Sequence, residues 1–281
     1  MSSPARRVAL VGRPLRRRHS QVMHDAAFAA NGIDARYELR ELAPEDLSGF
    51  VAEARGEEWL GFQITAPYKR DVMPLLDRVE PEAQAIGAVN SVAREDGALV
   101  GFNTDAPGWA AAVRRDLGLD LAGRRVVIAG AGGAAHAVAH AAVAGGAAEV
   151  RVIARTPGPA RALAARVAGV VPGTLDGSKA AHALGAADLV VNATTVGMLS
   201  SGTVIDPAVL RADTAVFDLA YVPVETELLR AARARGLRAA GGAAMLVAQA
   251  AIAFRRWTGV PDVTGVMTAA VEPLLAAAEA P

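Results

Sequence analysis

The sequence contains no cysteine, few aromatic residues and no excess of either charge. The absence of cysteine excludes a disulfide framework, a thiolate zinc site and a cysteine nucleophile, and it is typical of proteins of the reducing cytosol. The 29 basic and 29 acidic residues cancel, which argues against a nucleic-acid-binding protein, because such domains carry surplus positive charge. Lysine is scarce as well: all of the basic residues are arginine except Lys69 and Lys179. We therefore ask whether arginine could replace either lysine.

Long apolar runs of the kind that mark a signal peptide or a membrane span are also missing. Residues 8–11, behind Arg6 and Arg7, are far too short for the apolar core of a signal peptide. Residues 126–148 lack formal charge over a membrane-like length, but their glycines and histidines are typical of a strand, a glycine turn and a helix. We therefore expect a soluble, cytoplasmic protein, and 281 residues suffice for about two domains.

Short apolar runs alternate with longer amphipathic segments along most of the chain, and this alternation indicates an α/β fold. We expect strands at residues 8–11, 35–39, 59–65, 99–102, 125–129, 150–154, 188–192 and 215–219. We expect helices at residues 21–31, 44–54, 106–117, 134–144, 243–257 and 264–278. Residues 118–124 are the expected linker, and the proline- and glycine-rich residues 156–159 are expected to form a loop.

A glycine-rich turn lies between a predicted strand and a predicted helix. Residues 130–135 read Gly-Ala-Gly-Gly-Ala-Ala and match G-x-G-x-x-G/A in the strand–turn–helix context that this fingerprint requires. Gly130 would allow the tight turn, Gly132 would let the backbone approach a pyrophosphate, and Ala135 would keep the helix close to the strand, with its amides facing the phosphates. We interpret the turn as a Rossmann-type dinucleotide site; the alternative is an alanine- and glycine-rich turn without a ligand.

The end of the next predicted strand selects the cofactor. Proteins that bind NAD usually place Asp or Glu there to accept a hydrogen bond from the ribose 2′-hydroxyl. This chain has Ala154, Arg155 and Thr156, and Arg161 follows closely. A guanidinium beside a hydroxyl suits a 2′-phosphate, so we favour NADP over NAD. The alternative is that Arg155 is a solvated loop arginine.

Three segments of the N-terminal half carry more polar residues than strand ends require: residues 63–69, 87–90 and 101–105. Each follows or ends an apolar run, so we expect each at the carboxyl end of a strand, where open α/β sheets bind ligands. Lys69 and Asp105 could transfer a proton as an ammonium–carboxylate pair, a role that arginine cannot take because it holds its proton too tightly. The alternative is a surface lysine and an aspartate that caps a helix. Lys179 lies in a loop-like stretch, and we expect it to be solvated.

Six motifs, in this order, resemble the shikimate dehydrogenase family. The family patterns are N-V-T-x-P-x-K, G-A-V-N, N-T-D-x-x-G, G-A-G-G-A, N-A-T-x-x-G-M and G-x-x-M-L-x-x-Q. The corresponding segments here are QITAPYK (63–69), GAVN (87–90), NTDAPG (103–108), GAGGA (130–134), NATTVGM (192–198) and GAAMLVAQ (242–249). The match spans nearly the whole chain and is far more specific than a glycine fingerprint alone.

The resemblance implies a two-domain α/β fold. An N-terminal α/β substrate domain would comprise residues 1–105 and 242–281, because the C-terminal helices of the family return to the first domain. A Rossmann-type NADP-binding domain would comprise residues 106–241.

The resemblance also implies an oxidoreductase that uses NADPH to reduce 3-dehydroshikimate reversibly to shikimate, a step in the biosynthesis of chorismate and the aromatic amino acids. By similarity, Lys69 is the proton donor and Asp105 is its partner. The implied substrate-binding residues are Ser20, Thr65, Asn90, Tyr221 and Gln249, of which Ser20 and Tyr221 would hold the carboxylate. The implied cofactor-binding residues are Gly130, Ala131, Gly132, Gly133, Ala134, Ala135, Arg155, Thr156, Thr194, Leu219, Gly242 and Met245.

The chain departs from the family pattern at its N-terminus. The family reads G-x-P-I/L-x-x-S-x-S-P, and its two serines contact the substrate carboxylate. Here Arg18 occupies the first serine position, Ser20 the second, and Gln21 replaces the proline. Gln63 stands where asparagine is usual, as does Ala154. Arg18 could bind a carboxylate bidentately in a pocket reshaped for another acid, or it could be a solvated residue in a shifted register.

These departures leave alternatives for the function. One is a paralogue acting on quinate or another hydroxylated ring acid, and another is a non-catalytic NADPH-binding module. We expect no metal, because His136 and His140 lack the glutamate of H-E-x-x-H and no third ligand is evident. We expect a small hydroxylated ring acid as the partner and allow for a homodimer, and we expect neither nucleic acid nor membrane binding.

Overall fold

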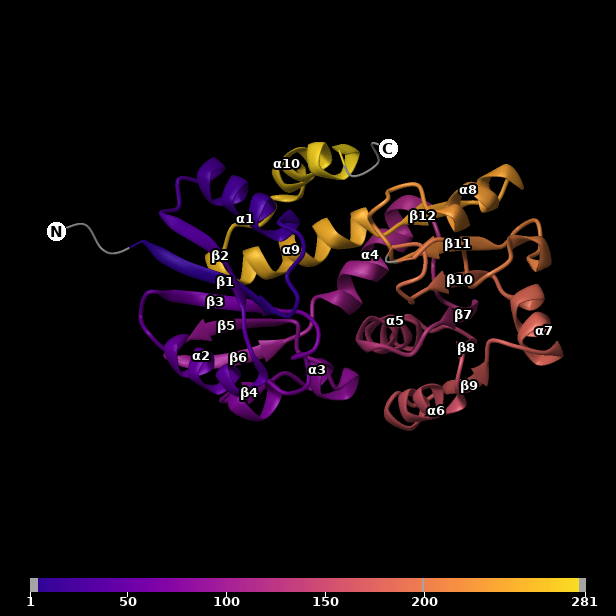
Figure 1. Ribbon diagram of the computed structural model, residues 1–281, viewed down its shortest axis with the longest axis horizontal. Helices are drawn as coiled ribbons and strands as arrows, with labels where there is room; N and C mark the ends of the chain where they lie inside the picture. Colours follow the sequence, from indigo (N-terminus) through magenta and orange to yellow (C-terminus); the bar gives the residue numbers. More distant parts are fainter. Residues whose placement is uncertain (1–4, 199, 278–281) are drawn as a thin grey trace. The chain divides into compact units, whose positions relative to one another are not determined.

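The computed structural model describes residues 5–198 and 200–277, which divide into two compact units (Figure 1). The first unit contains the described residues up to Thr104 together with Gln249–Leu274, and the second contains Asp105–Ala248 and the described residues after Leu274. The C-terminal helices thus return to the first unit. The division falls inside α9 (Ala243–Thr258), a few residues after the predicted boundary, because the first turns of this helix continue directly from the last strand of the second unit.

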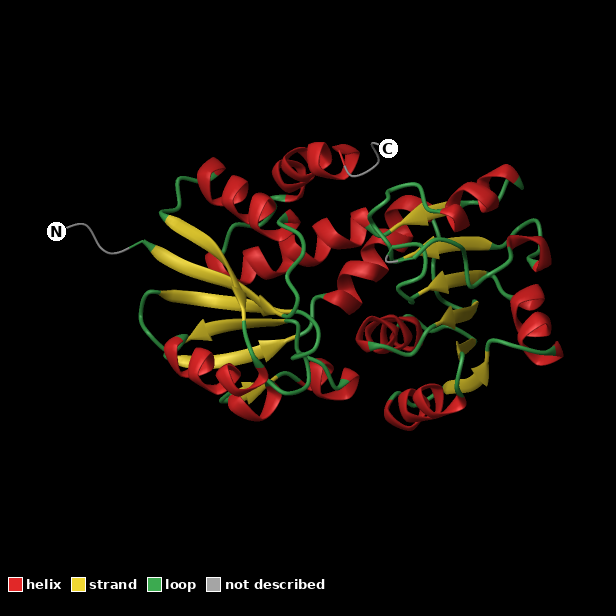
Figure 2. Cartoon of the chain, in the orientation of Figure 1, coloured by secondary structure: helices red, strands yellow, loops and turns green. Residues whose placement is uncertain are grey.

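The sheet of the first unit has the strand order β2-β1-β3-β5-β6-β4 (Figure 2). β1 is parallel to β2 and β3, whereas β5 is antiparallel to β3 and β6. The carboxyl ends of β1, β3 and β6 therefore lie at the same edge as the amino end of β5. The strands are β1 (Arg6–Gly12), β2 (Ala35–Glu41), β3 (Trp59–Ile64), β4 (Arg78–Val79), β5 (Ser91–Glu95) and β6 (Ala98–Phe102).

Aromatic side chains form much of the core of the first unit. The ring of Phe50 packs edge-on against Trp59 at 5.5 Å and against Phe62 at 5.1 Å, and Nε1 of Trp257 in α9 donates to the carbonyl oxygen of Val92 at 2.9 Å. Burial of such large rings is the main source of stabilisation. The helices of the unit are α1 (His19–Ala30), α2 (Leu47–Glu53), α3 (Pro81–Ile86), the later part of α9, and α10 (Thr264–Ala277) as far as Leu274, with short 3-10 turns at Pro44–Asp46 and Met73–Leu75.

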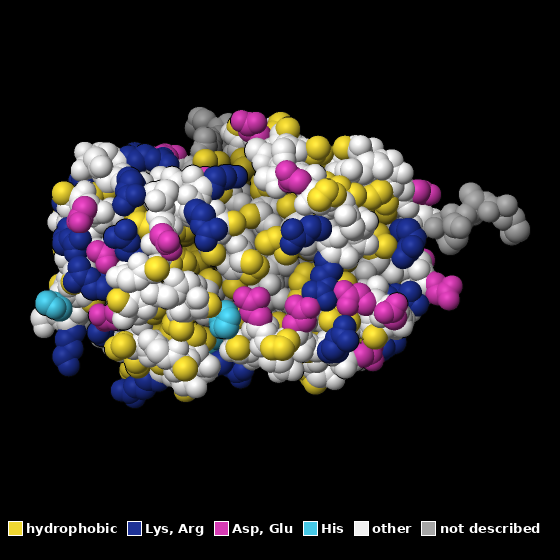
Figure 3. Space-filling model, turned by 180° about the vertical axis from the view of Figure 1, so that it is seen from behind, with side chains coloured by type: hydrophobic (Ala, Val, Ile, Leu, Met, Phe, Trp, Pro, Cys, Tyr) yellow, Lys and Arg dark blue, Asp and Glu magenta, His cyan; other side chains and the backbone are white. Residues whose placement is uncertain are grey.

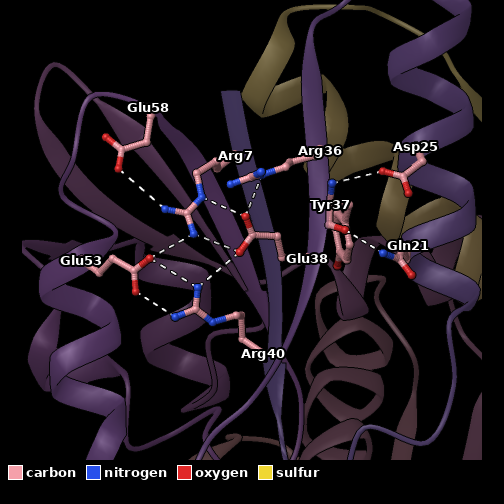
Figure 4. Close-up of polar contacts among 9 residues, drawn as sticks. All are labelled: Arg7, Gln21, Asp25, Arg36, Tyr37, Glu38, Arg40, Glu53 and Glu58. Carbon is pink, nitrogen blue, oxygen red and sulfur yellow. Dashed lines mark hydrogen bonds and ion pairs between the residues drawn. The ribbon is translucent and has the colours of Figure 1, made fainter. Parts of the chain in front are cut away.

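An ion-pair network covers one side of this core (Figure 4). The guanidinium of Arg7 lies 4.2 Å from the ring centroid of Trp59 and binds Glu38 at 2.9 Å and Glu53 at 3.0 Å. Arg40 binds the same two carboxylates at 3.2 and 2.9 Å. The hydrogen bond from Arg7 holds the pKa of Glu38 below its ordinary value. Because these side chains are partly exposed, each ion pair adds little to the stability of the fold.

The sheet of the second unit is entirely parallel, in the Rossmann order β12-β11-β10-β7-β8-β9. Its inner strands are buried apolar runs, as expected for a parallel sheet covered on both faces. The strands are β7 (Arg125–Ala129), β8 (Glu149–Ala154), β9 (Val170–Thr174), β10 (Leu189–Asn192), β11 (Ala215–Asp218) and β12 (Ala239–Gly241). The helices are α4 (Asp105–Leu117), α5 (Gly133–Ala144), α6 (Pro157–Arg166), α7 (Ser178–Ala186), α8 (Glu227–Ala234), a 3-10 turn at Pro207–Val209, and the start of α9.

Two of the expected loops are helical. Residues 156–159 do not form a loop, because α6 begins at Pro157 and its first turn tolerates residues without a free amide hydrogen. Lys179 lies in the first turn of α7, which forms because Ala180 and Leu184, four residues apart, are buried on one face. Strand β9 was not predicted either. It contains Pro172 and lies at the edge of its sheet, where a missing N–H is tolerated.

The surface carries both signs of charge. On the face that Figure 3 displays, arginine and lysine side chains are interspersed with aspartate and glutamate. Among the described residues, no helix combines the length and the apolar character that a membrane crossing requires.

Candidate active site

Backbone hydrogen bonds bring the three polar segments of the first unit together at one edge of its sheet. The N–H of Ile64 donates to Asn90 O at 2.9 Å, and the N–H of Asn90 donates to Phe102 O at 3.3 Å. The N–H of Val89 donates to Lys69 O at 2.8 Å. One detail of the prediction was wrong: Asn90 precedes a strand instead of following one. It still reaches this edge because β5 is antiparallel to β3 and β6.

The turn after β3 holds the backbone of Lys69 on both sides. Its neighbour Tyr68 is buried and donates its hydroxyl to Leu42 O at 2.6 Å, while the carbonyl of Lys69 itself accepts from Val89. The side chains of Thr65 and Lys69 are partly exposed. Asp105 follows Thr104 directly in the chain, begins α4 and is buried.

Amide and hydroxyl groups form a buried chain of hydrogen bonds at the same edge. Asn90 Nδ2 donates to Thr104 Oγ1 at 3.0 Å, and the N–H of Thr104 donates to Asn90 Oδ1 at 2.8 Å. Thr104 Oγ1 lies 3.4 Å from Gln249 Oε1, and Gln63 Nε2 donates to that same oxygen at 2.9 Å. The structure therefore brings together Asn90 and Gln249, two of the residues that the resemblance implies for the substrate, and joins them through Thr104.

A second layer lies behind Gln63, and no sequence motif pointed to it. Tyr37 donates its hydroxyl to Gln63 Oε1 at 2.6 Å, and the ring of His24 stacks on Tyr37 at 4.6 Å. Burial raises the pKa of Tyr37 well above its ordinary value, and a hydrogen bond with Ser20 opposes this shift. Burial lowers the pKa of His24 to about 3, against a smaller opposing effect of its hydrogen bond to Gln63. His24 is therefore neutral in the folded protein at physiological pH.

We expect this neutral His24 to make the fold sensitive to acid. In the unfolded chain His24 takes up a proton as the pH falls below its ordinary pKa of 6.5, whereas in the folded protein its pKa is about 3. Its contribution to stability is therefore complete above pH 6.5 and is lost as the pH falls below that value. Between pH 7 and pH 5 the free energy of unfolding should fall by about 2 kcal/mol through this residue alone. Urea unfolding of His24→Phe at both pH values should show a pH dependence smaller by that amount, and an unchanged dependence would contradict the buried neutral imidazole.

The start of α1 carries the two residues expected at the substrate carboxylate. Arg18 is exposed and precedes the first residue of the helix, and its Nε donates to Gln21 Oε1 at 3.0 Å. Ser20 is partly exposed and hydrogen-bonded to Tyr37. Ser20 is thus linked through Tyr37 to Gln63, and so to the amide chain described above. Tyr221, the third residue expected there, belongs to the second unit.

In the second unit, the glycine turn follows β7 and opens α5 as the fingerprint requires. Gly130 has φ of +112°, and a Cβ there would lie 2.7 Å from Ala193 O, so both the backbone conformation and the space demand glycine. A Cβ on Gly132 would meet no atom within 4 Å. The space beside Gly132, in front of the amides of α5, fits the pyrophosphate of a dinucleotide.

The end of β8 carries groups that suit a 2′-phosphate. Arg155 and Thr156 are both exposed, and Thr156 makes no side-chain cap to α6, whose N-terminus it precedes. A guanidinium, a hydroxyl and a helix N-terminus thus meet where the adenosine ribose of a dinucleotide lies in this fold. The donor set matches NADP and lacks the carboxylate that NAD would use.

Side chains at the ends of β10 and β11 hold the residue that packs against the glycine turn. Asn192 Nδ2 donates to Asp218 Oδ1 at 2.9 Å, while Asn192 Oδ1 accepts from the hydroxyl of Thr194 at 2.7 Å. Thr194 is thereby held beside Gly130. Asp218 is fully buried, which raises its pKa, and hydrogen bonds from the N–H of Ala220 and from other donors oppose this shift. Sequence reasoning missed Asp218, although it ends a strand just before Leu219.

Leu219, Gly242 and Met245, which the resemblance implies for the cofactor, also belong to the second unit. The N–H of Leu219 donates to Asn192 O at 2.9 Å, and the N–H of Gly242 donates to Ala220 O at 2.9 Å. A Cβ on Gly242 would lie 2.2 Å from Leu219 O, so only glycine permits this approach. Met245 is buried in the first turn of α9.

Two hollows of the second unit lie at different distances from the expected cofactor-binding residues. One of about 240 Å³ is lined by Tyr221, Gly241 and Ala244 among others. The larger, of about 730 Å³, lies at Arg125 and Glu149, which begin β7 and β8, and so at the opposite end of these strands from the glycine turn. Its size does not make it the site, because parallel sheets of this kind bind ligands at the carboxyl ends of their strands.

His136 and His140 lie on α5, and His136 is buried. Over residues 5–198 and 200–277, no group of three or more His, Cys, Asp or Glu side chains is placed to hold a metal ion.

Comparison with known proteins agrees with the geometry of both units. Residues 10–92 match the family described as shikimate dehydrogenase substrate binding domain. Residues 111–228 match shikimate / quinate 5-dehydrogenase, and residues 242–272 match the shikimate 5′-dehydrogenase C-terminal domain. The chain belongs to the shikimate dehydrogenase family. The family resemblance predicted from the six motifs is thus confirmed.

Individual members of the family match over nearly the whole chain. A shikimate dehydrogenase (NADP(+)) of Rubrobacter xylanophilus is 42% identical over 270 residues, which cover 94% of both chains. The structure of shikimate 5-dehydrogenase from Thermus thermophilus in complex with NADP(H) and shikimate has a TM-score of 0.85 and 38% identity, covering 95% of this chain and 99% of that chain. Quinate dehydrogenase from Corynebacterium glutamicum in complex with NAD has a TM-score of 0.89 and 35% identity, covering 96% and 99%. The predicted two-domain α/β fold is confirmed by these structures.

Proposed function

We propose that this protein is an NADP-dependent shikimate dehydrogenase, which interconverts 3-dehydroshikimate and shikimate. The observation that carries the proposal is the hydrogen-bonded convergence of residues 63–69, 87–90 and 101–104, which puts Lys69 at the same sheet edge as Asn90, Thr104 and Gln249. A titratable amine among amide and hydroxyl groups suits a polyhydroxylated ring whose carbonyl needs a proton. The similarity to relatives that are named for this activity supports the same assignment.

NADPH, when bound, supplies the hydride that adds to the carbonyl carbon of the ring. The ammonium of Lys69 then gives its proton to the carbonyl oxygen, which becomes the hydroxyl of shikimate, and in the reverse direction the neutral amine takes that proton back. Asp105 is the partner of Lys69 and binds a ring hydroxyl. Thr65, Asn90 and Gln249 hold the remaining hydroxyls and so orient the ring.

The cofactor is held by the second unit. The backbone of residues 130–135 would receive the pyrophosphate, while Arg155 and Thr156 would receive the 2′-phosphate. Thr194 and Leu219 would belong to the same cofactor site, and Gly242 and Met245 would lie against the nicotinamide. We assign residues 106–241 to the cofactor domain, which contains all of these residues except Gly242 and Met245.

A comparison of steady-state rates tests the function. The purified protein should oxidise shikimate with NADP⁺ at a higher kcat/KM than quinate, and NADP⁺ should be preferred to NAD⁺. A higher kcat/KM for quinate would overturn the substrate assignment. Tight binding of NADPH without turnover of either ring acid would instead indicate a non-catalytic NADPH-binding module.

Quinate is the second candidate substrate, because Arg18 and Gln63 depart from the family pattern at the substrate side. The likeness to a quinate dehydrogenase structure with a TM-score of 0.89 also favours it.

We expect Arg18→Ala to weaken binding of the substrate carboxylate. Nε of Arg18 is engaged with Gln21, and its exposed guanidinium still offers two further nitrogens to a carboxylate. Loss of a charge-assisted hydrogen bond should raise the KM for shikimate about tenfold and leave the KM for the methyl ester of shikimate unchanged. An unchanged KM for shikimate itself would place Arg18 in solvent.

We propose further that the protein acts in the cytoplasm, in keeping with its lack of cysteine. The homodimer is a separate proposal, which light scattering tests by comparing the mass in solution with 28.8 kDa for one chain.

A further inference from the structure

The amide of Gln63 joins two parts of the first unit that are far apart in the sequence. Its Oε1 accepts from the hydroxyl of Tyr37 at 2.6 Å and from Nε2 of His24 at 3.2 Å. Its Nε2 donates to Oε1 of Gln249 at 2.9 Å. All four side chains are at most 8% exposed. Hydrogen bonds in such a buried position are strongly directional, because a misplaced donor or acceptor finds no water to replace its partner.

Tyr37 and His24 determine which way round the Gln63 amide lies. Within the described part of the chain, Nδ1 of His24 is buried and has no hydrogen-bond partner, so the single ring proton of the neutral imidazole belongs on Nε2, which faces Gln63 Oε1. Both lone pairs of Gln63 Oε1 are then engaged, and an amide turned over would set its N–H groups against these two donors. The backbone of Tyr37 is fixed in turn, because its N–H donates to Asp25 and its carbonyl accepts from Gln21 (Figure 4).

We propose that Gln63 is a positioning residue that orients the amide of Gln249 for the substrate. Because the oxygen of Gln249 accepts from Gln63 and faces Thr104, its Nε2 is directed away from Gln63 and serves as the donor to a ring hydroxyl. This role rests on the proposed function, through the assignment of Gln249 to the substrate. An asparagine at position 63 is one methylene shorter and cannot span Tyr37 and Gln249 at these distances. The longer side chain is therefore matched to Tyr37 and His24.

The kinetic test is a double-mutant cycle between Gln63→Met and Gln249→Ala. Methionine keeps the approximate shape of Gln63 and removes all of its hydrogen bonds. Gln63→Met should raise the KM for shikimate about tenfold while kcat changes less than about threefold, since one hydrogen bond to substrate is lost and the proton donor is intact. In the Gln249→Ala background, Gln63→Met should have no further effect on KM. Effects that multiply independently would overturn the proposal.

Ser91→Ala is the matched control. Ser91 pairs with Gln63 across β3 and β5, is fully buried, and its Oγ makes no hydrogen bond within the described part of the chain. It therefore tests a buried polar change at the same place without touching the amide chain, and its KM should equal that of the unaltered protein. Gln63→Asn serves as a second variant if Gln63→Met does not fold, and the same rise in KM is expected.

Nuclear magnetic resonance separates a failure of this inference from a failure of the proposed function. The chain has only four glutamines (Gln21, Gln63, Gln84 and Gln249), so side-chain ¹⁵N-labelled glutamine gives four resolved amide groups without any substrate. The Gln249 signals should move in Gln63→Met and Gln63→Asn and stay in place in Ser91→Ala. Unmoved Gln249 signals would overturn the positioning role even if shikimate is turned over. If the Gln249 signals move in a protein that does not turn over shikimate, the orienting role of Gln63 is supported and only the assignment of shikimate as the substrate is refuted.

Discussion

Replacing Lys69 by arginine or by alanine is expected to lower kcat about 10²- to 10⁴-fold, the contribution of general acid–base catalysis. Arginine keeps the positive charge but holds its proton too tightly to give it to a developing alkoxide. The backbone at this position is fixed by Tyr68 on one side and Val89 on the other, so the substitution alters the side chain without freeing the turn. Stopped-flow single-turnover rates with NADPH measure the effect directly.

The only other lysine provides the control. Lys179 is exposed on α7, and Lys179→Arg should leave kcat within about twofold, because surface substitutions rarely matter. Small primary amines added to Lys69→Ala should restore part of the rate, which a merely misfolded protein would not allow. Turnover of Lys69→Arg near the normal rate would remove Lys69 from the proton transfer.

The strands and helices that sequence reasoning located best are those with a strong apolar signal. Val126–Ala129 of β7 is a buried run with no polar interruption, and the glycine turn that follows it needs only local residues to be recognised. Strand β9 was missed because Pro172 and Gly173 suppress the strand signal, and only its place at the sheet edge makes them acceptable. Position within a sheet is a tertiary property, which a local pattern does not contain.

The same reasoning explains what was found of the site and what was not. The motif around Lys69 and the motif around Asn90 were both found because each is contiguous. The contact between Gln63 and Gln249 spans 186 positions, and Tyr37 and His24 belong to no motif. Gln63 was noticed only as a departure from the family pattern, and its meaning depends on partners that the fold alone brings to it. Asp218 escaped for a similar reason, since its partner Asn192 lies on another strand.

Arg155→Asp is expected to reverse the preference for cofactor. A charge-assisted hydrogen bond to the 2′-phosphate is lost and a repulsive carboxylate takes its place, so the KM for NADPH should rise roughly 10- to 100-fold. The new carboxylate stands where NAD-binding proteins accept from the ribose 2′-hydroxyl, so the KM for NADH should stay the same or fall. Steady-state reduction of 3-dehydroshikimate with each cofactor measures the ratio of kcat/KM values.

Arg166 provides the control for this change, because it is exposed at the far end of α6 and has the same charge. Arg166→Asp alters the net charge of the second unit as Arg155→Asp does, yet it should leave the ratio of kcat/KM for NADPH and NADH unchanged. A long-range electrostatic effect would act on both variants, whereas direct recognition of the 2′-phosphate acts only through Arg155. Equal increases of both KM values in Arg155→Asp would show that this arginine supports the turn after β8 without reading the phosphate.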